Sequence, residues 1–417
     1  MTDFFSGRGI FAGSVFVEID HFNIPKEGEA SSGDVFLSEA GGKSRRIIAA
    51  LSDGLGSGIK ANVLASLTAK MIIKFVLSDI PPRRAAELIV NSLPVNSESS
   101  LSYAAFTLID IDKDFSVKII EYDSPPVIIA RDENILGLKK QKIPIERKNK
   151  KTGPKNETVC ISNFSARFGD RIIFFSDGVT QAGLGPDGKY PRGFGIANVK
   201  DFVKKTISAQ PDISARSLSQ NIVERAHICD NGRARDDISC ASAYFRRPRD
   251  LLVVSGPPYN PERDGDVAEM FTGFPGKKII SGGTTAQIIA RHLNKKIVYT
   301  VKTPRGYSKD EDGKTRIPPE SLMEGADLVC EGIITLGAVS EMLLETDTDI
   351  RDESPAAKMT ELFINSDRIL FLVGTRINEF HQDPSMPAEL EIRRNVVKKI
   401  AATLEDRYLK QVVIRYI

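Results

Sequence analysis

The 417-residue sequence has no tryptophan, few aromatic residues and almost no net charge. Its 57 Lys and Arg side chains against 55 Asp and Glu leave a formal charge of +2, which offers no global field to attract a polyanion. Aromatic residues make up 7% of the chain, so few rings are present on which bases could stack. We therefore expect no nucleic acid among its partners.

Cysteines and histidines are also scarce, with four of each. The cysteines lie far apart and form no C-x-x-C pair, so neither a zinc ribbon nor a dense disulfide framework is expected. The histidines show no clustered spacing of metal ligands. Any metal ion in this protein would therefore be held by oxygen.

Long apolar runs are missing too. The most apolar helix-like stretch, residues 59–77, is interrupted by Lys60, Lys70 and Lys74. No run of about eighteen uncharged apolar residues occurs, and the first residues do not have the order of a secretory signal. We expect a cytoplasmic protein with no membrane partner.

The chain is 41% hydrophobic, and its length predicts two or three domains. Residues 1–246 carry strand-like apolar runs, then two helical segments, then more strands, helices and a closing strand, which predicts an α+β domain. One apolar helix stripe is predicted by the recurrence every four residues of Ile59, Val63, Leu67, Met71 and Phe75, joined by Leu64, Ile72 and Val76 at neighbouring positions. A basic segment, residues 147–157, is expected to be an exposed loop, with a binding patch as the alternative.

A polar, proline-bearing boundary separates this half from residues 251–417, where short apolar strands alternate with helix-like spans. Such alternation predicts an α/β domain with a mainly parallel sheet covered by helices on both faces.

Four short acidic motifs stand at strand ends in the first half: Gly33-Asp34, Ser52-Asp53-Gly54, Ser176-Asp177-Gly178 and Asp236-Asp237-Ile238-Ser239. Taken singly, an Asp-Gly pair after a strand is most often a turn, because glycine accepts positive φ and Asp caps its own backbone. The four motifs together indicate more than four turns, because of where they stand in the sequence.

Asp53 and Asp177 each follow a continuous apolar run, so both carboxylates are expected at the ends of buried strands. A carboxylate there needs a cation or strong hydrogen bonds to stay ionised. Several carboxylates without histidine or thiolate suit Mg²⁺ or Mn²⁺, with coordination completed by water and a backbone carbonyl, for which Gly54 is a natural donor.

The motif Ser52-Asp53-Gly54-Leu55-Gly56-Ser57-Gly58, together with the Asp177 and Asp236 motifs, resembles the PPM superfamily of metal-dependent protein phosphatases. The form of the first motif is most similar to that of its bacterial SpoIIE-type branch, and the resemblance covers about residues 8–246. It implies a β-sandwich flanked by helices that holds two Mn²⁺ or Mg²⁺ ions.

Within that resemblance, Asp53 would bridge both ions and the Gly54 carbonyl would complete one of them. Asp177 and Asp236 would ligate the other ion, and Asp34 would contact the metals through water. Two departures from better-known members are visible: Leu55 stands where they carry a histidine, and Arg8 is the only early candidate for a phosphate-gripping arginine.

In the second half, Ser281, Gly282, Gly283, Thr284 and Thr285 form the best candidate for ligand binding. Small hydroxyl side chains and free N–H groups at a helix start can bind an anion. The alternatives are a plain strand-to-helix turn, a small anionic or nucleotide-like ligand, and a protein contact such as that of a homodimer.

Two functional hypotheses result. The first is a phosphoprotein phosphatase, with catalytic Asp53, Asp177 and Asp236, which acts on a phosphorylated regulatory protein and carries an appended regulatory α/β domain. The alternative is a catalytically weak or inactive binding module that senses a small anionic ligand through its C-terminal domain. In SpoIIE-type proteins the helix after Asp53 acts as a switch that completes the metal site on partner binding, and here it is either such a switch or simply a packed helix.

Overall fold

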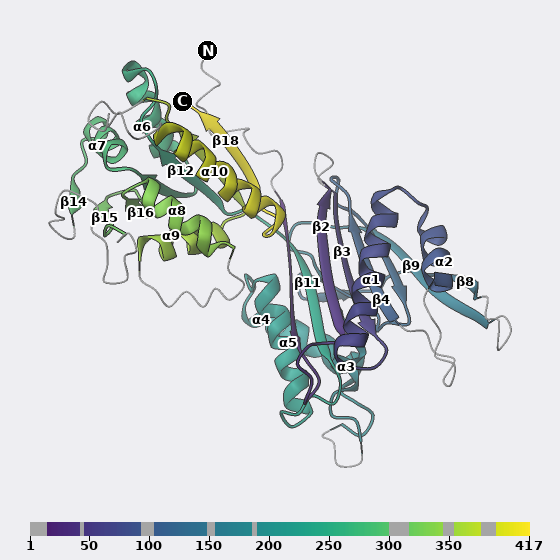
Figure 1. The fold of residues 1–417 in the computed structure, drawn as a ribbon. Coiled ribbons are helices and arrows are strands. Elements are labelled where there is room, and N and C mark those ends of the chain that lie inside the picture. The colour runs from purple at the N-terminus through teal and green to yellow at the C-terminus, as the bar shows by residue number, and fades with distance from the viewer. Residues whose placement is uncertain are drawn as a thin grey trace. The chain divides into compact units, whose positions relative to one another are not determined.

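The computed structural model describes residues 15–41, 46–92, 104–147, 155–185, 190–299, 317–344, 354–376 and 389–417. The chain divides into two compact units, which contain Val15–Arg247 and Pro248–Ile417 respectively (Figure 1). Among the helices in these ranges, none is long and apolar enough to cross a membrane.

Two antiparallel sheets form the first unit. The six-stranded sheet has the order β2-β3-β4-β5-β9-β8, with strands Asp34–Gly41, Arg46–Gly54, Ala104–Ile111, Ser116–Tyr122, Lys155–Ser165 and Gln141–Arg147. The five-stranded sheet has the order β1-β11-β10-β6-β7, with strands Phe16–Ile24, Ile238–Arg246, Arg171–Phe175, Ile128–Arg131 and Asn134–Leu136. The helices are α1 Gly58–Leu77, α2 Pro82–Ser92, α3 Asp177–Gln181, α4 Gly195–Ala209 and α5 Ala215–Cys229.

The two sheets pack face to face, and helices cover both outer faces. In β10, Ile172 and Phe174 point into the layer between the sheets, whereas Ile173 and Phe175 pack with residues of α4 and α5. Strand β3 is likewise buried on both faces, between the other sheet and α1. Because successive side chains of a strand alternate between faces, a strand in such a four-layer arrangement is a continuous apolar run. The predicted α+β sandwich flanked by helices is confirmed.

Strands β8 and β9 were not predicted from the sequence. The basic segment 147–157, expected to be a loop, begins on the last residue of β8 and ends on the first three residues of β9. Residues 148–154 lie outside the described ranges. The expectation of a loop was wrong at both ends, because lysine and asparagine residues are accepted in paired strands at the sheet edge.

Only the second half of the predicted α1 stripe packs on the sheet: Ile72 and Val76 are buried and Phe75 packs against the core, whereas the first half is exposed. Ile59, Val63 and Leu67 are 74%, 51% and 54% exposed. The buried face begins instead with small residues, among them Ala61 and Ala65, and continues with larger ones toward the C-terminal end. Small side chains let the helix backbone approach the sheet closely, while the larger side chains of its first turns stay outside.

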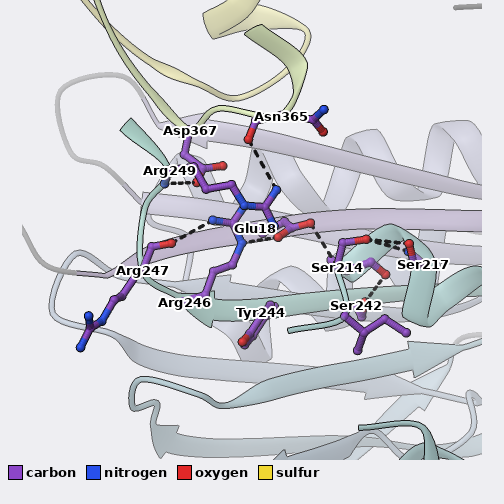
Figure 2. A network of polar contacts seen from close by, with 12 residues as sticks. Glu18, Ser214, Ser217, Ser242, Tyr244, Arg246, Arg247, Arg249, Asn365 and Asp367 are labelled. Atoms are coloured by element: carbon purple, nitrogen blue, oxygen red, sulfur yellow. Dashed lines mark hydrogen bonds and ion pairs between the residues drawn. The ribbon is translucent and has the colours of Figure 1, made fainter. Parts of the chain in front are cut away.

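A largely buried ion pair between Glu18 and Arg246 connects β1 to β11, and Glu18 also contacts the start of α5. Glu18 Oε2 accepts a hydrogen bond from Arg246 Nε, and Glu18 Oε1 accepts one from the backbone N–H of Ala215 at 3.1 Å. Ser242 Oγ donates to the Ala215 carbonyl at 2.7 Å. Figure 2 shows Glu18 and Arg246 pointing toward one another beside the start of α5, where Ser214 caps the helix by accepting from Ser217 N.

The second unit is built on a seven-stranded sheet of order β14-β15-β16-β13-β12-β17-β18. The strands in that order are Ile297–Tyr299, Ser321–Met323, Leu328–Cys330, Lys277–Ser281, Asp250–Ser255, Arg368–Val373 and Gln411–Tyr416. The five from β16 to β18 are parallel, and β14 and β15 pair antiparallel at one edge. The backbone N–H of Arg249 donates to the Asp367 carboxylate at 2.7 Å, which joins the start of β12 to the start of β17 (Figure 2).

Helices cover both faces of this sheet (Figure 1). Apolar residues of α6 (Asp264–Gly273) and α7 (Gly283–His292) pack on one face. Those of α8 (Ile333–Met342), α9 (Pro355–Ile364) and α10 (Glu389–Asp406) pack on the other. Numbered along the chain, the parallel strands have the order third, second, first, fourth, fifth, which is that of a doubly wound fold with a switch point between the first and fourth strands.

Candidate metal centre

Asp34 and Asp53 face each other across the end of a strand pair. Asp34 is the first residue of β2 and is directly opposite Asp53 in the register with β3. Like charges placed opposite each other in a sheet destabilise it. A bound cation or a proton on one carboxyl group would relieve the repulsion between Asp34 and Asp53.

Asp177 and Asp236 are brought near this pair by the second sheet. Asp177 is the first residue of α3, directly after β10, and Asp236 lies just before β11. Ser176 joins the two strands: its backbone N–H donates to the Ser239 carbonyl at 3.0 Å, and its Oγ accepts from Ser239 N at 3.1 Å and donates to the Asp237 carbonyl at 3.2 Å. The serine of the Ser-Asp-Gly motif thus holds both acidic segments together.

The glycines of the two Asp-Gly pairs allow backbones to approach closely. A Cβ on Gly54 would lie 2.3 Å from the carbonyl oxygen of Ala61 in α1, and a Cβ on Gly178 would lie 2.2 Å from that of Asp237. Both distances are too short for any side chain. These glycines are therefore required for packing, in addition to the ligand role expected of the Gly54 carbonyl.

The four carboxylates lie within electrostatic reach of one another. Burial raises the pKa of Asp53 well above its usual range, and the carboxylates of Asp34, Asp177 and Asp236 raise it further. Burial also raises the pKa of Asp34 to about 7, with the hydroxyls of Ser239 and Ser176 opposing the rise.

Burial is likewise the main cause of the raised pKa values of Asp177 and Asp236. For Asp177 the neighbouring carboxylate of Asp236 adds to the rise, whereas for Asp236 the backbone N–H of Asp237 and the charge of Lys26 oppose it. The structure thus brings the four predicted aspartates into one acidic cluster.

The donor set of this cluster fits a hard divalent cation. Asp34 Oδ2 is buried and has no hydrogen-bond partner within the described part of the chain. An unpartnered carboxylate oxygen among other carboxylates is the environment that Mg²⁺ or Mn²⁺ would satisfy. Among the described His, Cys, Asp and Glu side chains, however, no group of three is placed to hold a metal ion. The carboxylates are neighbours that would have to reorient to ligate one.

Several residues around the cluster were not predicted. Asp237 is 4% exposed, and its Oδ1 accepts from the backbone N–H of Lys26 at 3.1 Å. A Cβ on Gly33 would lie 2.9 Å from Asp237 Oδ2, so this side chain sets the path of the segment that leads to Asp34. The Asp-Asp pair in the sequence was the signal, but only the first aspartate was assigned a role.

Two hydrogen bonds tie the same segment to α1. Ser57 Oγ donates to Glu29 Oε1 at 2.8 Å, and Asn62 Nδ2 donates to the Ser32 carbonyl at 2.7 Å. The first turns of α1 therefore contact both sides of the cluster, the Asp53-Gly54 side through Ala61 and the Asp34 side through Asn62. No sequence motif predicted these contacts.

Leu55 and Arg8 are the two departures from better-known members that the resemblance showed. Leu55, at the position where other members carry a histidine, is 37% exposed. Arg8 lies outside the described residues, so its expected phosphate-gripping role stays a prediction.

The family model for Stage II sporulation protein E (SpoIIE) matches residues 43–246. These residues are therefore similar in sequence to the SpoIIE family. Stage II sporulation protein E of Bacillus subtilis (strain 168) is 30% identical over 217 residues, which are 51% of this chain and 24% of that relative. The chain thus spans about a quarter of the length of this curated relative.

Two solved structures are also similar to part of this chain. The phosphatase domain of SpoIIE from Bacillus subtilis matches with a TM-score of 0.42 and 21% identity, over 57% of this chain and 95% of that one. The RsbU and RsbW domains of a Mycobacterium tuberculosis protein match with a TM-score of 0.41 and 14% identity, over 61% and 67% of the two chains. The similarity to the SpoIIE family therefore rests on the sequence matches.

Proposed function

We propose that the first unit is a metal-dependent protein serine/threonine phosphatase that hydrolyses phosphoserine or phosphothreonine on a regulatory protein. The observation that carries this proposal is the acidic cluster, in which burial and then the neighbouring carboxylates raise the pKa values of Asp34, Asp53 and Asp177 near Asp236. Such a cluster costs stability unless it serves to hold cations.

Two Mn²⁺ or Mg²⁺ ions are the cofactors that this cluster fits. Asp53 and the Gly54 carbonyl would hold one ion, Asp53, Asp177 and Asp236 the other, and Asp34 would lie beside them. When bound, such ions supply a nucleophile from water at neutral pH and neutralise the phosphoryl oxygens. The protein's own part is to fix the carboxylates: Ser176 sets the separation of the Asp177 and Asp236 segments, and α1 positions Asp53 and Gly54.

A phosphorylated regulatory protein is the proposed substrate class because SpoIIE-type phosphatases commonly act on such proteins. The chain's near-neutral charge does not oppose this. With two divalent ions bound, the site itself becomes locally positive toward a phosphate group.

Helix α1 is the element through which a partner would regulate the site. Its outward stripe of Ile59, Val63 and Leu67 is exposed, while its inward face contacts Gly54 and the segment before Asp34. A partner that moved α1 would therefore move metal ligands on both sides of the cluster. If Mn²⁺ affinity is the same with and without the cognate partner, α1 is only a packed helix.

One observation favours the alternative, a catalytically weak or inactive binding module. No three of the described acidic side chains are placed to hold an ion. Against it, all three proposed catalytic residues, Asp53, Asp177 and Asp236, are present, which a degraded site would not require.

Hydrolysis of a phosphoserine peptide with and without Mn²⁺ decides between the two. We expect Mn²⁺-dependent release of phosphate by the wild type, and a loss of about 100-fold or more in Asp177→Asn because a charged metal ligand is removed. Asp201→Asn, an exposed aspartate on α4, is the matched control and should retain wild-type activity. Equal rates in the wild type and Asp177→Asn would remove the catalytic proposal.

A further inference from the structure

The candidate ligand-binding segment of the second unit lies where a strand leads into a helix. Ser281 ends β13, and α7 begins at Gly283. Thr285 Oγ1, in the first turn of α7, accepts from the backbone N–H of Gly256 at 3.1 Å, which ties the helix start to the residue that follows β12. The segment is thus a strand-to-helix turn, and its anion-binding role stays a prediction.

The loop between β1 and β2 runs beside the acidic cluster. The backbone N–H of Lys26 donates to Asp237 Oδ1 at 3.1 Å. The next backbone N–H, that of Glu27, donates to the Ala234 carbonyl at 2.9 Å. Asp236, the proposed metal ligand, stands between these two acceptors in the sequence. The backbone at Lys26 is therefore fixed beside the segment that carries Asp236.

Acidic side chains on the same loop have partners other than Lys26. Glu27 Oε1 lies 3.9 Å from Arg233 Nε. Glu29 Oε1 accepts from Ser57 Oγ at 2.8 Å, at the start of α1. Among the residues that the structure describes, the partly buried side chain of Lys26 forms no hydrogen bond and no ion pair. Neither carboxylate of the loop therefore neutralises this ammonium group.

The charge of Lys26 acts on the acidic cluster. Burial raises the pKa of Asp236, and the backbone N–H of Asp237 and the charge of Lys26 oppose that rise. The ammonium group thus lies within electrostatic reach of Asp236. It has only hydrogen-bond donors, so it cannot itself ligate a metal ion. It is suited instead to an anion that enters the site from outside.

The other basic side chains on this segment are already engaged. Arg233 pairs with Glu27, and Arg235 Nη1 donates to the Leu184 carbonyl. Both arginines are exposed, whereas Lys26 is partly buried. Of these three cations, Lys26 is the one that combines burial, a fixed backbone and an ammonium group without a described partner.

We propose that Lys26 binds the phosphoryl oxygens of the substrate, and that Asp237 positions it by accepting from its backbone N–H. This inference rests on the proposed phosphatase function and names a residue that holds the phosphate group of that substrate. A lysine ammonium binds phosphate through its full charge and three donors. With the aspartates neutralised by metal ions, its charge adds to the attraction for a phosphate group. The two aspartates of the Asp236-Asp237 pair thus have different tasks.

Isothermal titration calorimetry on the full-length protein tests this role. Lys26→Met removes the charge at similar length, Lys26→Arg keeps the charge, and both keep the backbone bond to Asp237. Mn²⁺ is titrated into the metal-free protein, and inorganic phosphate into the Mn²⁺-loaded protein. Because an ammonium repels a cation and attracts an anion, Lys26→Met should bind Mn²⁺ as tightly as the wild type, or up to about threefold more tightly. It should bind phosphate about tenfold or more weakly.

Two controls separate the charge of Lys26 from the folding of its loop. Lys26→Arg should stay within about threefold of the wild type for both ligands. Arg233→Met, an exposed change on the neighbouring segment, should match the wild type. Weaker binding of both Mn²⁺ and phosphate by Lys26→Met would show that the lysine only supports the structure, and would overturn the inference.

Hydrolysis of a phosphoserine peptide distinguishes failure of this inference from failure of the proposed function. A wild type that releases no phosphate with Mn²⁺ contradicts the proposed function, and this inference with it. With an active wild type, Lys26→Met should lower kcat/KM by about tenfold or more at saturating Mn²⁺. Unchanged kcat/KM or unchanged phosphate affinity in Lys26→Met overturns the inference alone and leaves the phosphatase function standing.

Discussion

Asp34→Asn should stabilise the metal-free protein at neutral pH. In the folded state the pKa of Asp34 is raised from 3.8 to about 7, mainly by burial. Between these two pH values the folded state keeps a proton that the unfolded state releases, so the free energy of unfolding falls as pH rises. Below pH 4 both states are protonated and the destabilisation is absent.

The size of the effect follows from this difference in pKa. A rise from 3.8 to about 7 corresponds to roughly 4 kcal/mol at about 1.36 kcal/mol per pH unit. Because the neighbouring carboxylates share this cost, we expect the substitution alone to recover roughly 2–4 kcal/mol at pH 7.5. For a domain of this size that is a rise of about 5–10 °C in Tm.

Scanning calorimetry in EDTA at pH 4 and pH 7.5 measures it. Asp34→Asn should match the wild type at pH 4 and exceed it at pH 7.5, whereas the exposed control Asp201→Asn should match it at both. With Mn²⁺ in place of EDTA, the wild type should gain more stability than Asp34→Asn. Destabilisation by Asp34→Asn at pH 7.5 in EDTA, or an equal effect at both pH values, would refute the electrostatic reasoning.

Three further predictions concern packing and positioning. Glu18→Gln, which leaves the nearly buried guanidinium of Arg246 without its charged partner, should lower the free energy of unfolding by about 3 kcal/mol in urea titrations. Gly178→Ala should cost about 1–3 kcal/mol because its Cβ would overlap a carbonyl oxygen, while Gly137→Ala, with open space around it, should cost nothing measurable. Asn62→Ala should weaken Mn²⁺ binding by about 2- to 10-fold in calorimetric titrations because the bond to the segment before Asp34 is lost, and unchanged affinity would show that this bond does not position the site.

Much of the fold was predictable because its strands are continuous apolar runs bounded by turns. Residues 171–175 and 368–373 are such runs, and the structure forms strands over these same residues. Strand β8 was missed because it is an edge strand with many polar residues and lacks a strong pattern. Strand β9 lies between β5 and β8, and it was missed because it begins with polar residues. The first half of the α1 stripe was expected to be buried and is exposed for a different reason. Both sides of that helix are apolar, and periodicity does not reveal that the alanine side is the one that fits against the sheet.

The aspartates of the acidic cluster were predicted from the sequence, but the residues whose hydrogen bonds hold the surrounding segments in place were not. Asp53 and Asp177 were recognisable because each follows a buried strand and precedes glycine. Asn62 and Ser57 were not, since their hydrogen bonds depend on the path of a segment about thirty residues away in the sequence. Asp237 was passed over because its role, accepting from Lys26 N, appears only once the strands are paired.

Anomalous diffraction from crystals grown with Mn²⁺ tests the central claim most directly. Data collected at the manganese edge should show peaks at about 2.1 Å from carboxylate oxygens of Asp53, Asp177 and Asp236, as expected for a hard divalent ion. These peaks should be absent in Asp53→Asn crystals. An active protein without a manganese peak beside Asp53 would contradict the account.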